Sequence, residues 1–436
     1  MKLILKNNYR QSIELVFILF CFVFSFTIIG PITSSLFVAI ICFRFYNYGY
    51  LKQLRIILTS SYSKSMFKIM FILVLLSLLY PLAHLSLDFY FLKIITLLIS
   101  QFTLGCIVWA FIKYKNLCTN TTHLYSCIIT AFVIQSIIQC VVSFTPSLLP
   151  IIYHFNNAQS INESYTRLFG SGVRGVAMAN GTGFSLSLAY GISYIVFIKY
   201  TLEKGGSIWS IICGLLLVIG VFFAGRSSFI GVGIGLLYYY ISPQGPSFIV
   251  KVGNFFKILL GVAVLLLIVY ICLPDFSNHI INNVLPFAFE PIYNLINNNT
   301  FESASTNDLG NMWQTPVTDK EILLGAGCYF EPGHNFYYKR VDIGILKNIF
   351  FWGIIGYLLI VIFQFVQLYP LLQKHTPSKD KLFFFSILIF LWILDFKAIA
   401  LSLNKTAFSM IILLILEYEG NLIHHPISTV NIRSRR

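Results

Sequence analysis

Long runs of uncharged, apolar residues recur along most of the chain, and they limit the possible folds more than any other feature. Hydrophobic residues make up 57% of the 436 residues, charged residues only 11%, and the mean hydropathy is +0.80. A soluble domain carries about 25% charged residues. The composition therefore excludes a water-soluble globule, a disordered chain and a nucleic-acid-binding module. It predicts an integral membrane protein whose spanning helices need roughly 20 apolar residues each.

Twelve apolar runs are candidates for these spanning helices. They lie at about 12–30, 31–46, 66–86, 91–112, 123–144, 178–198, 206–224, 227–242, 255–273, 346–369, 381–399 and 402–418. Only Gly30-Pro31 separates the first run from the second, so these two residues must make the whole turn. The sequence thus predicts an all-α, polytopic membrane protein with about 12 transmembrane helices and both termini on one side.

The basic residues orient these helices. The net charge is +14, from 30 Lys and Arg residues and 16 Asp and Glu residues. Most of the basic residues fall in segments that are cytoplasmic when the N-terminus is inside, although the opposite side carries the longest loops. Because cytoplasmic segments are enriched in Lys and Arg, we expect both termini to be cytoplasmic. The excess charge then serves orientation and contacts with anionic lipid.

The cysteines and the N-terminal basic residues have plain structural explanations. Most of the nine cysteines lie inside apolar runs and none forms a C-x-x-C pair, which favours small apolar packing over a disulfide frame or a zinc site. Lys2, Lys6 and Arg10 precede the first run, as in a signal peptide. No small-residue cleavage site follows them, which predicts a retained first helix.

Two longer segments, at about 145–177 and 274–345, interrupt the succession of spans on the outer side. The second lies between the ninth and tenth spans, holds half of the 16 acidic residues and is rich in aromatics, which favours a folded external cap. The chain is therefore predicted to comprise N-terminal transmembrane helices, an outer loop with Arg-bearing core helices, a large outer loop, C-terminal transmembrane helices and a cytoplasmic tail. These parts cover residues 1–144, 145–273, 274–345, 346–418 and 419–436.

A first group of chemically informative residues lies just before the sixth span. Arg167-Leu-Phe-Gly170 and Arg174 lead into Asn180-Gly-Thr-Gly183. The arginine side chain is a planar fork suited to phosphate oxygens, and glycines let a backbone approach a bulky ligand closely. The group predicts a pyrophosphate clamp at the outer membrane surface. The alternative is a pair of arginines that snorkel at the interface.

A second feature is Gly225-Arg226-Ser227, a tight turn between the seventh and eighth runs with no loop around it. An ionisable residue at such a depth is functional by default. Arg226 is therefore a candidate for contact with an anionic substrate. The alternatives are a cap on backbone carbonyls and a structural ion pair.

A third feature closes the large outer loop. His334 can accept a proton near neutral pH, and Asp342 can orient a base or pair with an arginine. Side chains suited to sugars and anions surround them, namely Tyr337, Tyr338, Lys339 and Arg340. The alternative is a polar loop end with tyrosines at the membrane interface. The outer acids are scattered without metal-ligand spacing, so no metal site is predicted.

The order of these motifs resembles that of the O-antigen polymerase (Wzy-type) and O-antigen ligase superfamily. The matching elements are Arg167-x-x-Gly170 before Asn180, the Gly225-Arg226-Ser227 turn, and a long external loop with Gly325-x-Gly327. His334-Asn335, Tyr337-Tyr338-Lys339 and Asp342-x-Gly344 then lead into a span. The likeness covers about 165–365. His334-Asn335 is similar to the ligases, whereas the continuation through Asp342 is more similar to the polymerases.

The resemblance implies a bacterial inner-membrane glycosyltransferase with a GT-C-like helical architecture. Its substrate would be an undecaprenyl-pyrophosphate-linked oligosaccharide, and it would use no nucleotide sugar, metal or other cofactor. A polymerase moves the growing chain from its lipid pyrophosphate to the next lipid-linked repeat at the periplasmic face, where a chain-length regulator and a flippase are its expected partners. The resemblance gives no nucleic-acid partner.

The predicted roles follow from this chemistry. His334 is the first candidate for the base that activates the acceptor hydroxyl, Asp342 is the second, and Arg226 stabilises the departing pyrophosphate. The predicted substrate-binding residues are Arg167, Arg174, Asn180, Asn335, Tyr337, Tyr338, Lys339 and Arg340.

Two other functions stay open beside the polymerase. An O-antigen ligase would transfer the glycan to lipid A-core, and a lipid-linked oligosaccharide flippase would form no glycosidic bond. The sequence sets neither the sugars and the linkage nor the choice among O-antigen, capsule and common antigen.

Overall fold

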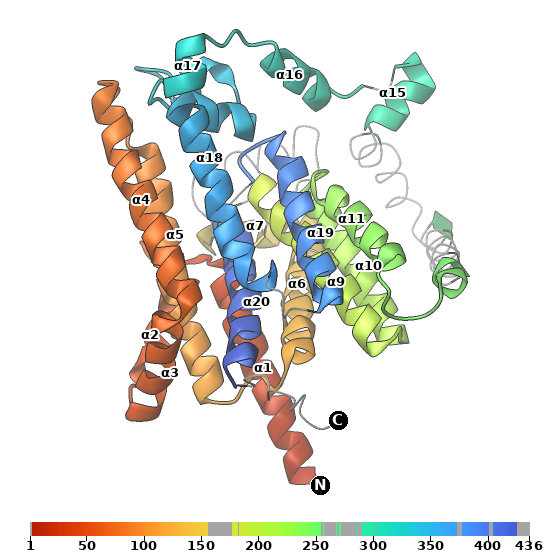
Figure 1. Cartoon of the computed structure of the whole chain (residues 1–436). Helices are drawn as coiled ribbons and strands as arrows, with labels where there is room; N and C mark the ends of the chain where they lie inside the picture. Colours follow the sequence, from red (N-terminus) through yellow and green to blue (C-terminus); the bar gives the residue numbers. More distant parts are fainter. Residues whose placement is uncertain are drawn as a thin grey trace, which may run out of the picture.

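Helices form nearly all of the regular structure, and most of them run side by side in one bundle (Figure 1). The computed structural model describes residues 2–155, 177–181, 183–253, 256, 267, 270–271, 286, 290–300, 302–372, 377–400 and 404–424. Helix α1 begins and α20 ends at one end of the bundle, and the short helices α15, α16 and α17 lie at the other. We call the latter end the outer end.

Among the described residues, five helices are long and apolar enough to cross a membrane. They are α4 (Ser61–Ala83), α5 (Tyr90–Tyr114), α6 (Thr121–Phe144), α9 (Phe184–Lys204) and α18 (Gly344–Leu372). Helices of spanning length and hydropathy are thereby confirmed for the runs 66–86, 91–112, 123–144 and 346–369. The run 178–198 is shifted, because Gly181 and Gly183 take positive φ angles and α9 starts only at Phe184.

Other apolar runs are also helical. The runs 206–224 and 227–242 form the shorter helices α10 (Ile208–Ala224) and α11 (Ser228–Ile241). The runs 381–399 and 402–418 form α19 (Ser378–Asp395) and α20 (Lys405–His424), which carry charged residues. Most of the run 255–273 lies outside the described residues. The described residues are thus mostly helical with candidate membrane spans, as an all-α membrane protein requires, whereas twelve spans and a GT-C arrangement stay predictions.

The first two predicted spans were wrong in detail. Helix α1 (Lys2–Phe24) ends before a short antiparallel hairpin of β1 (Thr27–Ile29) and β2 (Ile32–Thr33), and α2 (Ser34–Arg44) follows. The β-branched residues on both sides of Gly30-Pro31 favour strands, and the Gly-Pro pair favours a turn. Helix α2 has 11 residues and is about 16 Å long, roughly half of an apolar bilayer core. The run 31–46 is therefore not a complete crossing.

The remaining elements connect the bundle helices and build the large loop. Helix α3 (Tyr48–Thr59) leads into α4, and η1 (Pro146–Leu148) and α7 (Leu149–Phe155) follow α6. The described part of the large loop is folded and contains α15 (Glu290–Asn298), α16 (Ala304–Trp313), α17 (Asp319–Leu324) and the turn η3 (Tyr338–Arg340).

Helix α18 is broken at Gly353, and this break seats the large loop on the bundle. Gly353 has φ 66° and ψ 180°, so the carbonyls of the preceding turn lack partners within the helix. The N–H of Ala326 donates to the Phe350 carbonyl, and the N–H of Gly327 donates to the Phe351 carbonyl. Backbone thus packs directly on backbone just after α17.

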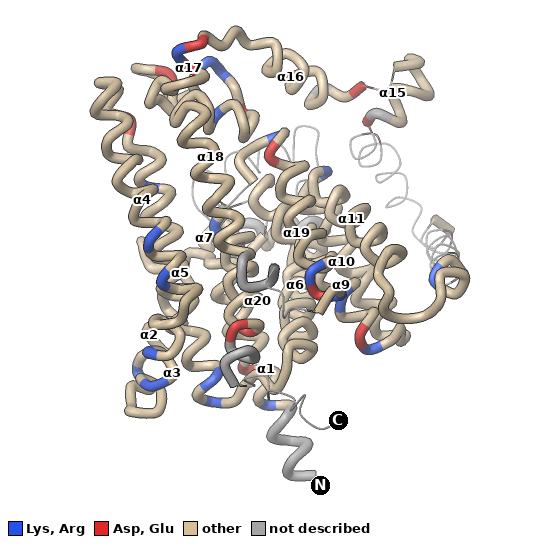
Figure 2. The backbone as a smooth tube through the Cα atoms, viewed as in Figure 1, with Lys and Arg blue, Asp and Glu red and all other residues tan. Residues whose placement is uncertain are grey.

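The end where α1 begins and α20 ends is joined by buried ion pairs. Lys113 of α5 contacts Glu417 of α20 at 2.6 Å, and Lys199 of α9 contacts Asp380 of α19 at 2.6 Å. Glu417 and Lys199 are fully buried. Figure 2 shows further basic residues around this end and on α2 and α3, and the cytoplasmic orientation of this end stays a prediction.

We expect Gly353→Ala to destabilise the protein by about 2–4 kcal/mol, because it adds left-handed backbone strain to a steric clash. A Cβ at this position would lie 2.4 Å from the Leu323 carbonyl oxygen. Thermal unfolding in detergent measures the effect. Gly233→Ala in α11 is the matched control, because a Cβ there meets no atom within 4 Å. Equal unfolding temperatures for the two variants would contradict the importance of this close contact.

Candidate functional site

Only part of the predicted pyrophosphate clamp lies among the described residues. Arg167 and Arg174 lie outside the described residues. Asn180 is described, and its backbone N–H donates to the Phe24 carbonyl at 2.9 Å. This bond places the segment before α9 beside the end of α1, inside the bundle.

Arg226 lies in the turn between α10 and α11, as the sequence predicted, and it forms an ion pair. Its Nη1 donates to Glu290 Oε2 at 2.6 Å, which joins the turn to the first residue of α15. The turn is tightly built, because Gly225 has φ 141° and the Ser228 hydroxyl donates to the Val221 carbonyl. The ion-pair alternative is therefore observed. The two side chains are 22% and 25% exposed, which leaves the guanidinium within reach of a ligand.

His334 and Arg340 share one aromatic ring on the surface of the large loop. The chain reverses between Phe330 and Tyr337, which form a β-bridge, and His334 lies in the exposed turn between them. The imidazole stacks on the Phe336 ring with centroids 4.7 Å apart, and the Arg340 guanidinium lies 5.0 Å from the same ring. Asn335 is exposed beside them. A base and a cation are thus presented together to solvent.

Tyr337 and Asp342 share a buried lysine that the sequence interpretation missed. Lys347, in the first turn of α18, forms an ion pair with Asp342, and its Nζ lies 3.1 Å from the centroid of the Tyr337 ring. The Lys347 side chain is 6% exposed, whereas that of Asp342 is 47% exposed. Asp342 was predicted to orient a base or pair with an arginine. Its partner is instead a lysine, and within the described residues Asp342 forms no hydrogen bond with His334.

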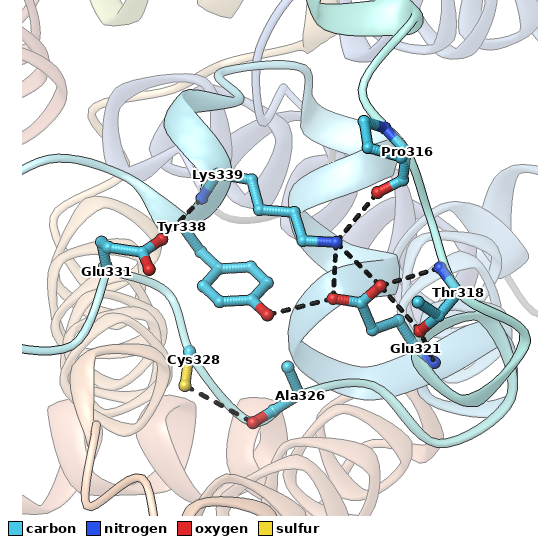
Figure 3. Close-up of polar contacts among 8 residues, drawn as sticks. All are labelled: Pro316, Thr318, Glu321, Ala326, Cys328, Glu331, Tyr338 and Lys339. Atoms are coloured by element: carbon cyan, nitrogen blue, oxygen red, sulfur yellow. Dashed lines mark hydrogen bonds and ion pairs between the residues drawn. The ribbon is translucent and has the colours of Figure 1, made fainter.

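Tyr338 and Lys339 face into the loop rather than toward a ligand (Figure 3). The Lys339 Nζ contacts both carboxylate oxygens of Glu321, at 2.7 and 2.8 Å, and the Tyr338 hydroxyl donates to Glu321 at 3.0 Å. Lys339 and Arg340 both take left-handed φ angles, 53° and 58°, to make this turn. An internal carboxylate holds both side chains, and the substrate contacts of Tyr338 and Lys339 stay a prediction.

The environment of Glu321 explains its charge. Thr318 and Glu321 form a capping box at the start of α17, in which the Thr318 N–H and hydroxyl each donate to Glu321 at 2.8 Å. Burial alone would raise the pKa of Glu321, but the donors from Lys339, Thr318 and Tyr338 outweigh it and lower the pKa to about 2. Burial and the bond to Glu321 raise the pKa of Tyr338. The carboxylate is thus ionised and the phenol neutral near pH 7.

Asp88 fastens the other edge of this loop to the bundle. Its carboxylate accepts from the N–H groups of Tyr329 and Phe330, at 2.7 and 2.9 Å, and from the N–H of Tyr90 at the start of α5. The rings of Tyr90 and Tyr329 stack with centroids 4.4 Å apart. The sequence interpretation did not single out Asp88, although an acidic residue just before a helix is a recognisable N-terminal signal.

The charged and polar residues of the candidate site therefore fall into two classes, those that hold the loop in place and those that are exposed to a ligand. Tyr338, Lys339, Glu321 and Asp88 build the loop, whereas His334, Arg340 and Asp342 are presented at its surface and Arg226 at its contact with the bundle. This surface therefore offers a ligand two proton acceptors, His334 and Asp342, and two cations, Arg340 and Arg226. Within the described ranges, no three His, Cys, Asp or Glu side chains gather as a metal site would require.

No protein family, curated protein or solved structure matches this chain. The resemblance to the polymerase and ligase superfamily therefore stays a prediction from the motifs themselves.

We expect Glu321→Gln to loosen the loop by about 2–3 kcal/mol, since it replaces charge-assisted hydrogen bonds of a buried carboxylate. Hydrogen exchange of the amides in residues 316–341 measures this opening. The wild-type contribution is fully present above the ordinary pKa of 4.5 and is lost as the pH falls toward the folded pKa of about 2.

The exposed Glu302 gives the matched control, because it bonds only to nearby groups of the same loop at its surface. Glu302→Gln should leave the exchange unchanged, and Glu321→Gln should remove its dependence on pH between 4.5 and 2. Fast exchange in the wild-type loop at pH 7 would contradict the conclusion that the contacts of Glu321 hold the loop closed.

Proposed function

We propose that this protein is a bacterial surface-polysaccharide polymerase of the O-antigen type, located in the inner membrane with its termini in the cytoplasm. It would join undecaprenyl-pyrophosphate-linked repeat units at the periplasmic face. One observation carries the proposal. A folded loop at the outer end of the bundle presents His334 and Arg340 on one aromatic ring and Asp342 two residues further along, and a second cation, Arg226, contacts the same loop.

The reaction would be a glycosyl transfer without a cofactor. An acceptor hydroxyl attacks the anomeric carbon of the donor sugar, its proton passes to a base, and the bond between that carbon and the lipid pyrophosphate breaks. Positive charge must lie where the pyrophosphate departs. Arg226, with Arg167 and Arg174, would supply it, and Asn180 and Asn335 would contribute polar contacts to the substrate.

Asp342 is better fixed for the role of base than His334. A buried ammonium holds its carboxylate, while nearly half of its side chain stays exposed. His334 lies at the tip of an exposed turn and stacks on one ring. A general base has to be positioned within hydrogen-bond distance of the hydroxyl, which favours the carboxylate. His334, Arg340 and Tyr337 would then contact the saccharide.

The end of the bundle where α1 begins and α20 ends argues against the flippase alternative. A carrier has to open toward the cytoplasm, and the buried pairs Lys113–Glu417 and Lys199–Asp380 join helices there. Loss of a partner from a buried pair costs about 3–5 kcal/mol. A ligase would use the same outer surface, so the acceptor decides between ligase and polymerase.

Deletion of the gene should leave lipopolysaccharide core carrying a single repeat, and complementation should restore the ladder of longer chains on a gel. Loss of every repeat-bearing band would instead indicate ligation or export of the units and overturn the polymerase assignment. In the complemented strain, Arg226→Ala, Arg167→Ala and Arg174→Ala should each shorten the polymer at normal expression. Lys93→Ala, at an exposed lysine of α5, is the control.

Asp342→Asn should slow polymer formation from purified lipid-linked repeats by at least about 100-fold, the usual contribution of a general base. His334→Gln should slow it less, because this side chain is placed among the sugar contacts. Full activity of Asp342→Asn together with an inactive His334→Gln would return the role of base to His334.

A further inference from the structure

The ion pair between Arg226 and Glu290 joins a turn of the bundle to a helix of the large outer loop. Arg226 lies in the tight turn between α10 and α11, where the Ser228 hydroxyl bonds to the backbone of α10. Glu290 is the first residue of α15, which lies at the edge of the outer end (Figure 1). The guanidinium donates to the carboxylate at 2.6 Å.

This pair is less shielded than the other ion pairs among the described residues. Both of its side chains are more than a fifth exposed. In each of the others, one partner is 11% exposed or less. Ion pairs open to solvent hold their partners weakly. The Arg226–Glu290 contact is therefore the one that an incoming ion can break most readily.

The chemistry of the contact selects the kind of ion that would break it. A guanidinium binds carboxylate and phosphate oxygens through the same planar set of N–H donors. An anion that approaches Arg226 has to compete with the Glu290 carboxylate. A diphosphate carries more negative charge than one carboxylate and can engage several donors, so it is the stronger competitor.

Helix α15 can bind to a membrane surface after an anion has displaced Glu290 from Arg226. Ile292, Leu295 and Ile296 are exposed and recur at the spacing of one helical face. A short helix with an exposed apolar face rests in the boundary between head groups and acyl chains. Lipid can therefore accept α15 when its contact with Arg226 is lost.

We propose that Glu290 is an internal competitor at the anion site of Arg226, and that the diphosphate head group of a polyprenyl-linked substrate displaces it and releases α15. This step rests on the proposed function, because it takes Arg226 as a diphosphate contact. Helix α15 then separates from Arg226 when a lipid diphosphate arrives, while the part of the loop after α17 stays on the bundle. No covalent change is involved.

The test is the binding of farnesyl diphosphate to the purified full chain in neutral-lipid nanodiscs. Glu290→Gln should bind it about three- to ten-fold more tightly than the wild type. Arg226→Gln should bind at least ten-fold more weakly, and the addition of Glu290→Gln to that variant should bring no gain. Glu302→Gln removes an exposed acid of the same loop and should change nothing.

A structural readout separates competition from a general change in charge. Chymotrypsin should cut at Tyr293 and Leu295 of α15 slowly in the wild type, faster when farnesyl diphosphate is added, and fast in Glu290→Gln at all times. Glu290→Asp keeps the charge and should remain slow without ligand. Thermal unfolding of each variant shows that the chain is folded.

The possible failures are distinguishable. If Arg226→Gln weakens binding but Glu290→Gln neither tightens it nor exposes α15, the anion site stands and the competitor is overturned. If Arg226→Gln binds as tightly as the wild type, Arg226 is no diphosphate contact, and the proposed role of this residue falls together with the inference.

Discussion

A break in an apolar helix has to be repaired by hydrogen bonds from other parts of the protein, because lipid offers no donors. At Gly353 of α18 the repair comes from the N–H groups of Ala326 and Gly327. These two bonds fix the segment after α17 against the bundle. The positions of Glu321 just before it and of Tyr329 just after it follow from that contact. The geometry of the outer surface therefore depends on one glycine within a membrane helix.

Electrostatics then divides the charged residues of the loop into those that build it and those that remain accessible. Lys339 lies near a carboxylate whose pKa is lowered to about 2, so the protein itself already neutralises its charge. Asp342 shares a buried ammonium, but nearly half of its side chain faces outward. Arg226 is intermediate, since its partner is itself partly exposed. The degree of shielding, rather than the charge alone, indicates which of these residues can meet a substrate.

Hydropathy could predict much of the fold, because an apolar run long enough to cross a bilayer has few alternatives to a helix. It placed α4, α5, α6 and α18 to within a few residues. Hydropathy could not reveal the hairpin at Gly30-Pro31, because the β-branched residues of its strands are as apolar as the residues of a membrane helix. The site was harder to predict, because motifs reveal neighbours along the chain only. Glu321 lies far before Tyr338 in sequence, and Lys347 lies beyond the motif that contains Asp342, so neither partner could be foreseen.

The two ends of the bundle differ in a way that bears on the direction of chemistry. At one end, each of the pairs that join α5 to α20 and α9 to α19 has one fully buried partner, Glu417 or Lys199, and a separation there would leave an unpaired charge in an apolar interior. At the other, both partners of each described pair keep some exposure to water. Motion costs less where charges can be solvated as they part. The anionic substrate that we propose would therefore bind at the outer end, where it can replace an acidic side chain and keep the cation paired.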